Sequence, residues 1–122
     1  MRSFYGGDGL AVRPDYRSFV LEQLEFAGPI VAKSMFGGLG LYSGKYFFAI
    51  VFNDALYFKV DDANRTDYIT NGMSPFQPFK HKPATLQYYE VPIHIIEDRK
   101  LLKIWAAKAI DAAKYSKRRK PK

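Results

Sequence analysis

The 122-residue sequence predicts an α+β fold, in which an antiparallel β-meander sheet is covered by N-terminal and C-terminal helices. Two observations carry this prediction. First, residues 33–60 alternate aromatic and β-branched runs with two short turns, a pattern typical of consecutive hairpins. Second, apolar residues recur at helical spacing on both sides of that stretch. The hydrophobic content of 48% suits a single folded domain, and the absence of cysteine excludes disulfides and thiolate sites.

The turns Ser43-Gly44 and Asn53-Asp54 divide the meander, because these residue types tolerate positive φ. They leave strands at 39–42, 45–52 and 55–60. With two-residue loops, strand alternation sorts the side chains onto two faces. One face then carries Phe47, Ala49, Val51, Leu56, Phe58 and Val60, opposite Gly38 and Gly40. The other face carries Leu39, Leu41, Tyr46, Phe48, Ile50, Phe52, Tyr57 and Lys59.

Both predicted faces are apolar, and an antiparallel sheet that faces water on one side normally alternates apolar with polar residues. Each face therefore needs a cover. Helices of the same chain are expected on the first face. More chain, a second subunit or a ligand is expected on the second face. A slip of one residue at either turn would exchange these assignments.

Before the meander, Pro14 opens a predicted helix that Gly28 and Pro29 end. Residues 30–35 form a short strand or the approach to one. Gly37-Gly38 then sits at a bulge or admits a close backbone approach. A phosphate-binding loop is disfavoured here, because the strand–loop–helix context of such a site is absent.

After the meander, Asp61 or Asp62 is expected to cap a short helix. Its acidic residues lack the alternating pattern of a calcium loop. Three prolines then exclude a regular helix or a central strand, so Phe76 and Phe79 are expected to pack on the sheet edge. The predicted elements are a helix at 61–71, an ordered loop at 73–83, a strand at 84–89 and a final helix at 97–115 with one broad apolar side.

Positive charge is concentrated at the C-terminal end. The chain holds 19 basic and 12 acidic residues, for a net charge of +7. Six basic and no acidic residues lie in 114–122, so the first 113 residues carry 13 basic and 12 acidic residues. We therefore expect a flexible leader at 1–13, a domain at 14–115 and a basic tail at 116–122. This tail is either merely solvated or contacts phosphates in a salt-dependent manner with little sequence specificity.

No catalytic, metal-binding or cofactor-binding set emerges from the sequence. His81 and His94 are the only histidines, and they lie in different segments without metal-ligand spacing. The serines have no sequence context that supplies a base and its orienting partner. We expect no enzymatic activity. Lys59 lies in an otherwise apolar strand, where it is either an edge or snorkelling lysine or contacts an anion or a partner beside Tyr46 and Tyr57.

Two surfaces are the candidate sites for partners. A partner or dimer face is predicted at Leu39, Leu41, Tyr46, Phe48, Tyr57 and Lys59. Weak, nonspecific nucleic-acid contact is predicted at Lys100, Lys103, Lys114, Lys117, Arg118, Arg119, Lys120 and Lys122. No apolar run approaches the ~18 residues of a transmembrane helix, and no signal peptide is evident, so we expect a cytoplasmic protein without membrane contact.

Five short motifs in the same order resemble the N-terminal domain of the TfoX/Sxy family, bacterial regulators of natural competence. They cover roughly residues 15–115. They are SMFGGLGLY at 34–42, ALYFKVD at 55–61, GMSPF at 72–76, YYEVP at 88–92, and the closing helix from Leu102 to Ala113. Full-length family members carry a second, helical domain, and here a short basic tail follows the first domain.

The resemblance implies an α+β domain and a role in transcription of competence genes alongside a cyclic-AMP receptor protein. It brings no catalytic residues. We therefore expect a non-enzymatic regulatory or protein-interaction module, homodimeric, with a protein partner in transcription and without a cofactor. One alternative is a nucleic-acid-associated protein that uses the basic tail. A further alternative is a small-molecule or enzymatic site on the sheet.

Overall fold

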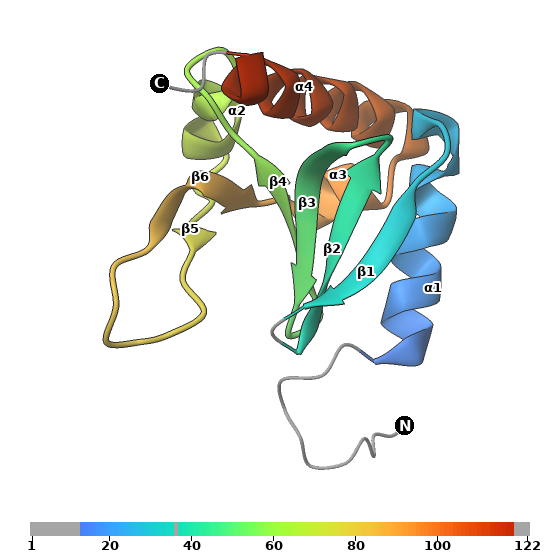
Figure 1. Cartoon of the computed structure of the whole chain (residues 1–122), viewed down its shortest axis with the longest axis horizontal. Coiled ribbons are helices and arrows are strands. Elements are labelled where there is room, and N and C mark those ends of the chain that lie inside the picture. The colour runs from blue at the N-terminus through green and yellow to red at the C-terminus, as the bar shows by residue number, and fades with distance from the viewer. Residues whose placement is uncertain (1–12, 36, 119–122) are drawn as a thin grey trace.

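The computed structural model describes residues 13–35 and 37–118, which form one six-stranded antiparallel sheet with helices packed against it (Figure 1). The α+β prediction is confirmed. In chain order the elements are α1 (Pro14–Gln23), the 3₁₀ turn η1 (Leu24–Ala27), β1 (Val31–Met35), β2 (Gly38–Ser43), β3 (Tyr46–Phe52), β4 (Ala55–Lys59), α2 (Arg65–Thr70), β5 (Pro75–Phe76), β6 (Thr85–Glu90), α3 (Ile93–Ile96) and α4 (Arg99–Arg118). The strand order across the sheet is β1-β2-β3-β4-β6-β5.

The second hairpin has the predicted register. Phe52 pairs with Ala55 across a two-residue turn, and both Asn53 and Asp54 have positive φ, at 52° and 57°. Two consecutive left-handed residues match the right-handed twist of the strands, which is why Asn and Asp suit this turn.

The predicted register of the first hairpin is wrong. Ser43 pairs with Tyr46, so the turn residues are Gly44 and Lys45 rather than Ser43-Gly44. The pairing then shifts, since Tyr42 lies opposite Phe47 while Leu41 lies opposite Ala49. Phe48 is the extra residue of a β-bulge. A bulge places two consecutive side chains of one strand on nearly the same side, which simple alternation cannot anticipate.

The bulge changes the predicted faces. Of the residues assigned to the second face, Leu39, Leu41, Tyr46 and Phe48 pack instead in the helix-covered core. Phe47 lies on the opposite side from that predicted. The rest of the assignment is confirmed: Ala49, Val51, Leu56, Phe58 and Val60 lie in the helix-covered core, and Ile50, Phe52 and Tyr57 pack on the other face.

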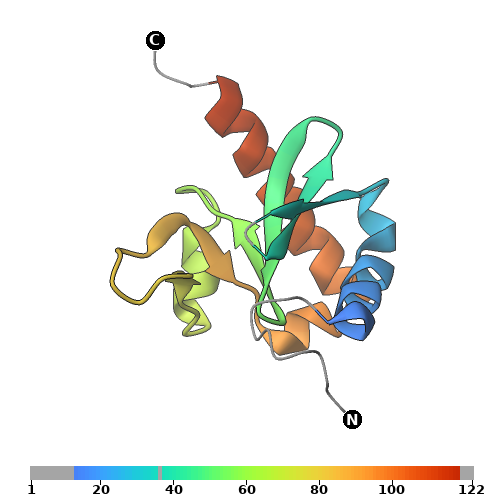
Figure 2. The same ribbon diagram turned by 60° about the horizontal axis from the view of Figure 1, so that its bottom comes forward.

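The helices supply the cover of the first face. Leu102, Ala106 and Ala109 of α4 are fully buried against the sheet, with Val20 of α1 and Tyr68 of α2 beside them. Alanine has almost no side chain, so α4 approaches the strands closely, as Figure 2 shows where the helix crosses behind β3. We call this helix-covered side of the sheet the closed face.

The C-terminal helical region is longer than predicted and divided. A short α3 precedes α4, and the Asp98 carboxylate accepts hydrogen bonds from the N–H groups of Lys100 and Leu101. This is an N-cap, which satisfies donors that the first helical turn leaves free. α4 continues to Arg118, so the first residues of the predicted tail are helical. Residues 1–12 of the predicted leader and 119–122 of the tail lie outside the described residues.

Two local predictions between β4 and β6 need correction. The expected helix at 61–71 begins only at Arg65, because Asn64 first closes a turn: its amide oxygen accepts the N–H of Asp61 at 2.8 Å. In the proline-rich segment Phe76 packs on the sheet as expected, whereas Phe79 is half exposed.

Within the described residues, no helix combines the length and hydropathy that a membrane crossing requires.

Candidate functional site on the open face of the sheet

The face of the sheet opposite the helices carries mainly aromatic residues, and we call it the open face. Its cluster contains only strand residues: Phe47, Ile50, Phe52, Tyr57, Phe76 and Tyr88. The helix residues of the larger buried cluster, such as Leu102, Ala106 and Ala109, pack on the closed face instead. The open face is nevertheless not bathed in solvent, because Ile50, Phe52 and Tyr88 are each only 8% exposed.

The rings of the open face cover one another. Tyr42 stacks on Phe47 at a centroid distance of 5.1 Å, and Phe47 meets Tyr88 at 5.6 Å. Phe76 of the edge strand β5 contacts Tyr57 and Phe52 edge-on, at 4.8 and 5.6 Å. Edge-on and offset contacts of this kind are the favourable arrangements of aromatic pairs. The chain therefore covers this face with its own side chains rather than with a helix.

Lys59 is the charged residue that the open face buries. It ends β4, pairs with Tyr88 of β6 and is only 8% exposed. Its ammonium donates a hydrogen bond of 2.8 Å to Oε1 of Gln87 and lies 5.1 Å from the centre of the Tyr88 ring. Burial lowers the pKa of Lys59, and the nearby Asp61 carboxylate partly opposes this shift.

Neither structural expectation for Lys59 describes its position well. An edge lysine is excluded, because β4 is hydrogen-bonded to β3 on one side and to β6 on the other. A snorkelling lysine describes it only in part, because the residue is 8% exposed while its part-buried ammonium is hydrogen-bonded to Gln87 at the border of a cavity. Tyr46 is also not its neighbour, since that ring lies on the closed side.

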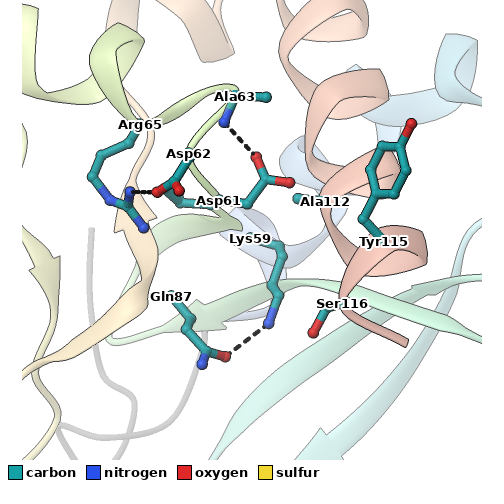
Figure 3. Close-up of a pocket in the computed structure, with 10 residues that line it drawn as sticks. Lys59, Asp61, Asp62, Ala63, Arg65, Gln87, Ala112, Tyr115 and Ser116 are labelled. Carbon is teal, nitrogen blue, oxygen red and sulfur yellow. Dashed lines mark hydrogen bonds and ion pairs between the residues drawn. The ribbon is translucent and has the colours of Figure 1, made fainter. Parts of the chain in front are cut away.

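A cavity of about 580 Å³ opens beside Lys59, and we call it the Lys59 cleft (Figure 3). It lies between the end of β4, the turn that leads to α2, the strand β6 and the last turns of α4. Arg65 and Asp62 pair with each other at its rim, and Asp61 accepts the N–H of Ala63 at 2.9 Å. Its lining consists of Lys59, Val60, Asp61, Asp62, Ala63, Arg65, Gln87, Ala112, Tyr115 and Ser116.

A second feature lies near the C-terminal end of α4, where the β2–β3 turn approaches the helix. The ammonium groups of Lys45 and Lys114 lie 5.6 and 5.7 Å from the centre of the same ring, that of Tyr46. We call Lys45, Tyr46 and Lys114 the basic end. Lys114 also lines a hollow of about 280 Å³ with Asp111 and with Lys103, which lies near the start of α4.

The structure separates the predicted site residues. Of the predicted partner face, only Tyr57 and Lys59 lie on the open face, while Leu39, Leu41, Tyr46 and Phe48 lie on the closed face. Of the predicted nucleic-acid contacts, Lys100 and Lys103 are exposed on α4 and Lys114 is partly buried. Lys117 and Arg118 belong to the last turn of α4, and Arg119, Lys120 and Lys122 lie outside the described residues.

Sequence reasoning missed Gln87 and Lys45. Gln87 reaches Lys59 because β6 pairs with β4. The two residues are 28 positions apart, and no local sequence pattern predicts that these two strands pair. Lys45 could have been found, since a lysine beside an aromatic residue at a hairpin turn is readable in the sequence. His81 and His94 are both exposed and lie in different segments, the loop before β6 and α3.

These features define a small α+β domain whose antiparallel sheet is closed by helices on one face and by its own aromatic side chains on the other. The family model of the TfoX N-terminal domain matches residues 22–113. The chain therefore belongs to the TfoX N-terminal domain family. None of the curated proteins matches this chain.

Proposed function

We propose that this chain is a non-enzymatic regulatory module that acts in the cytoplasm by binding other macromolecules in the control of transcription. Membership of the TfoX N-terminal domain family supports the regulatory part of this proposal. The single observation that supports the binding part is the construction of the open face. Among the described residues, the side chains of its apolar cluster all come from strands, and exposed aliphatic side chains adjoin them at the sheet margin.

The partner on this face is proposed to be a second copy of the chain, with a transcription protein as the partner of the dimer. Val31 pairs with Tyr42, so its side chain adjoins the open face, and it is 51% exposed. It belongs to β1, an edge strand with one side unpaired. Apolar side chains beside an unpaired edge are the kind of surface that a second sheet covers.

Sedimentation velocity over a wide range of protein concentration tests the dimer. The informative variant is Val31→Lys, which places a charge beside the open face. Ile104→Lys is the matched control, because Ile104 is also 51% exposed but lies on α4. We expect a concentration-dependent dimer that Val31→Lys dissociates and Ile104→Lys preserves. A wild-type chain that stays monomeric throughout, or equal effects of both variants, would reject this use of the open face.

The basic end favours a second candidate function, which is weak nucleic-acid binding. Two ammonium groups gather around Tyr46 beside the end of α4, and the sequence continues from there into further basic residues. Such groups bind phosphates, and their affinity depends on salt rather than on sequence. The proposal is that this end strengthens the attachment of the regulatory module to nucleic acid.

Deletion of residues 117–122 tests this candidate, measured as duplex DNA affinity at several salt concentrations. We expect most of the binding to disappear. The slope of log affinity against log salt should fall by roughly 0.9 for each phosphate that the shortened chain no longer neutralises. Lys45→Ala should weaken binding further, whereas Lys108→Ala should not, because Lys108 is already paired with Asp67 at 3.0 Å. Unchanged affinity after the deletion would remove the tail from the mechanism.

A further inference from the structure

Lys59 is the charged residue that is buried among those the structure describes, and its partly buried ammonium lies beside neutral groups. The acceptor it reaches is the amide oxygen of Gln87, and the surface beneath it is the ring of Tyr88. Within the described part of the chain, its ammonium has no carboxylate within ion-pair distance. A charge that is partly shielded from water and has no opposite charge is unfavourable, so an anion that reached this ammonium would gain a strong partner.

The Lys59 cleft provides the space for such an anion. Its volume of about 580 Å³ is within the range of small-molecule sites. The hydroxyl of Ser116 and the amide of Gln87 border it as further polar groups, and Ala112 contributes an apolar wall (Figure 3). Three separate segments of the chain, 59–65, 87 and 112–116, build these walls, so folding forms the cleft before any ligand arrives.

The remaining charges of the cleft restrict the ligand. Arg65 is paired with Asp62 at the rim, which leaves Lys59 as the cation that lacks a charged partner among the described lining residues. Asp61 is close enough to influence the titration of Lys59 without forming an ion pair with it. A carboxylate in that position repels a ligand that carries several anionic groups. The cleft therefore suits a small molecule with one anionic group.

We propose that the Lys59 cleft binds a small ligand through a single carboxylate or phosphate group held by Lys59. Gln87 positions the ammonium, and the groups at the end of α4 contact the rest of the ligand. The proposal is independent of the dimer and of the nucleic-acid contact, since neither Val31 nor the basic end lines this cleft.

Two fragment probes test the site on the full chain: sodium acetate for a carboxylate and sodium phosphate for a phosphate. Each is titrated at constant ionic strength while amide resonances are followed by NMR. We expect saturable shifts centred on residues 59–63, 87 and 112–116 with at least one probe. The probe that binds more tightly identifies the anionic group. Shifts that are linear in concentration or spread over the surface, with both probes, would overturn the proposal.

Lys59→Met removes the charge with little change in side-chain length, and Lys33→Met is its matched control. Lys33 also holds its ammonium 5.1 Å from a tyrosine ring, that of Tyr42, but it is exposed and outside the cleft. We expect Lys59→Met to weaken the probe by about ten- to a hundredfold, the range for a charged hydrogen bond. Lys33→Met should leave the affinity unchanged. Equal behaviour of the two variants would exclude Lys59 as the anion ligand.

Gln87→Glu provides an independent test that keeps Lys59 in place. It substitutes a carboxylate for the amide that accepts the Lys59 hydrogen bond, so the ammonium gains a permanent anionic partner. The expected result is a folded protein that has lost affinity for both probes. Undiminished binding by this variant would contradict the proposal, even if Lys59→Met failed to fold.

Discussion

The two faces of the sheet are both apolar, yet they are closed by different means. On the closed face, Leu41, Phe48, Leu56 and Phe58 are completely buried beneath helices. On the open face, Ile50, Phe52, Phe76 and Tyr88 each keep 8% of their surface, and their cover is mainly one another. Helices bury aliphatic side chains fully, whereas a face that covers itself needs large rings that reach sideways.

The contrast extends to charge. Lys59 is the one charged residue that is buried among the described residues, and it lies on the open face with a neutral acceptor and an aromatic ring. The Lys59 cleft forms at the end of β4, where the margin of the open face meets the last turns of α4. We therefore expect the closed face to dominate stability and the open face to dominate binding.

The largest expected difference separates two neighbouring phenylalanines. Phe48 is completely buried on the closed face, 5.8 Å from the ring of Phe58, and Phe47 is only partly buried on the open face. Phe48→Ala should lower the free energy of unfolding by about 3–5 kcal/mol, and Phe47→Ala by roughly half of that. Urea denaturation measures both. Losses of equal size would show that the open face is as firmly packed as the closed face.

Alanine substitutions at two glycines of β2 should cause a smaller loss in the free energy of unfolding. A Cβ at Gly38 would collide with the backbone carbonyl oxygen of Val51, which cannot move aside without disturbing the sheet. A Cβ at Gly40 would meet the Met35 sulfur at 2.7 Å and the Phe47 ring at 2.9 Å, and methionine can rotate away. Gly38→Ala should therefore destabilise by about 1–3 kcal/mol, and Gly40→Ala by less. Thermal unfolding that ranks them in the opposite order would contradict the close approach of β3 to β2 at Gly38.

Alkaline pH should lower the stability of the fold, because a buried tyrosine on each face of the sheet ionises. Burial raises the pKa of Tyr88 on the open face to about 12, and it raises the pKa of Tyr68 on the closed face further. A tyrosine in the unfolded chain titrates near 10.0. The neutral rings thus stabilise the fold fully below pH 10, and this stability is lost as pH rises from about 10 through the folded pKa values.

Urea midpoints followed from neutral to alkaline pH measure this loss. Tyr68→Phe should remove more of the alkaline destabilisation than Tyr88→Phe, because Tyr68 is the more deeply buried ring. If Tyr88→Phe had the larger effect, the ranking of the two faces would be reversed.

The smallest expected change in stability is at Lys59, where substitution should stabilise the fold rather than destabilise it. Burial lowers its pKa below the usual 10.5, so the ammonium form is less stable in the folded chain than in the unfolded chain. Lys59→Met should raise the unfolding free energy at neutral pH by up to about 1 kcal/mol, since one hydrogen bond is exchanged for relief of the buried charge. As pH rises through the window below 10.5 the wild type gains stability, and the difference between the two proteins should shrink. A difference that grows with pH would contradict the direction of the shift.

Much of the fold could be predicted from local patterns. Pro14 and Gly28 bound the first helical region, and Asn53-Asp54 forms the turn of the second hairpin in the expected register. These features depend on backbone preferences of a few consecutive residues. The predicted register of the first hairpin is wrong because a β-bulge at Phe48 buries two consecutive residues, Phe48 and Ala49, in the same helix-covered core. The helices that pack on these residues stabilise the bulge.

The candidate site was much less predictable than the fold. The sequence singles out Lys59, because a lysine in an apolar strand is conspicuous. It does not indicate the neighbours of Lys59, because Gln87 and Tyr88 reach it through the pairing of β6 with β4, and Ser116 reaches the cleft through the packing of α4. The predicted partner face mixed residues from both sides of the sheet because the bulge in β3 could not be read from alternation.

Local chemistry alone places the hairpin turns to within one residue, indicates most of the helical and extended segments, and shows that two apolar faces require covering. Turn residues, caps and periodicity act within a few positions, so one sequence is enough to read them. Which face the helices cover, where the bulge falls and what surrounds Lys59 depend on contacts between distant segments. Those contacts exist only once the helices and strands pack together, because burial is a property of the assembled layers.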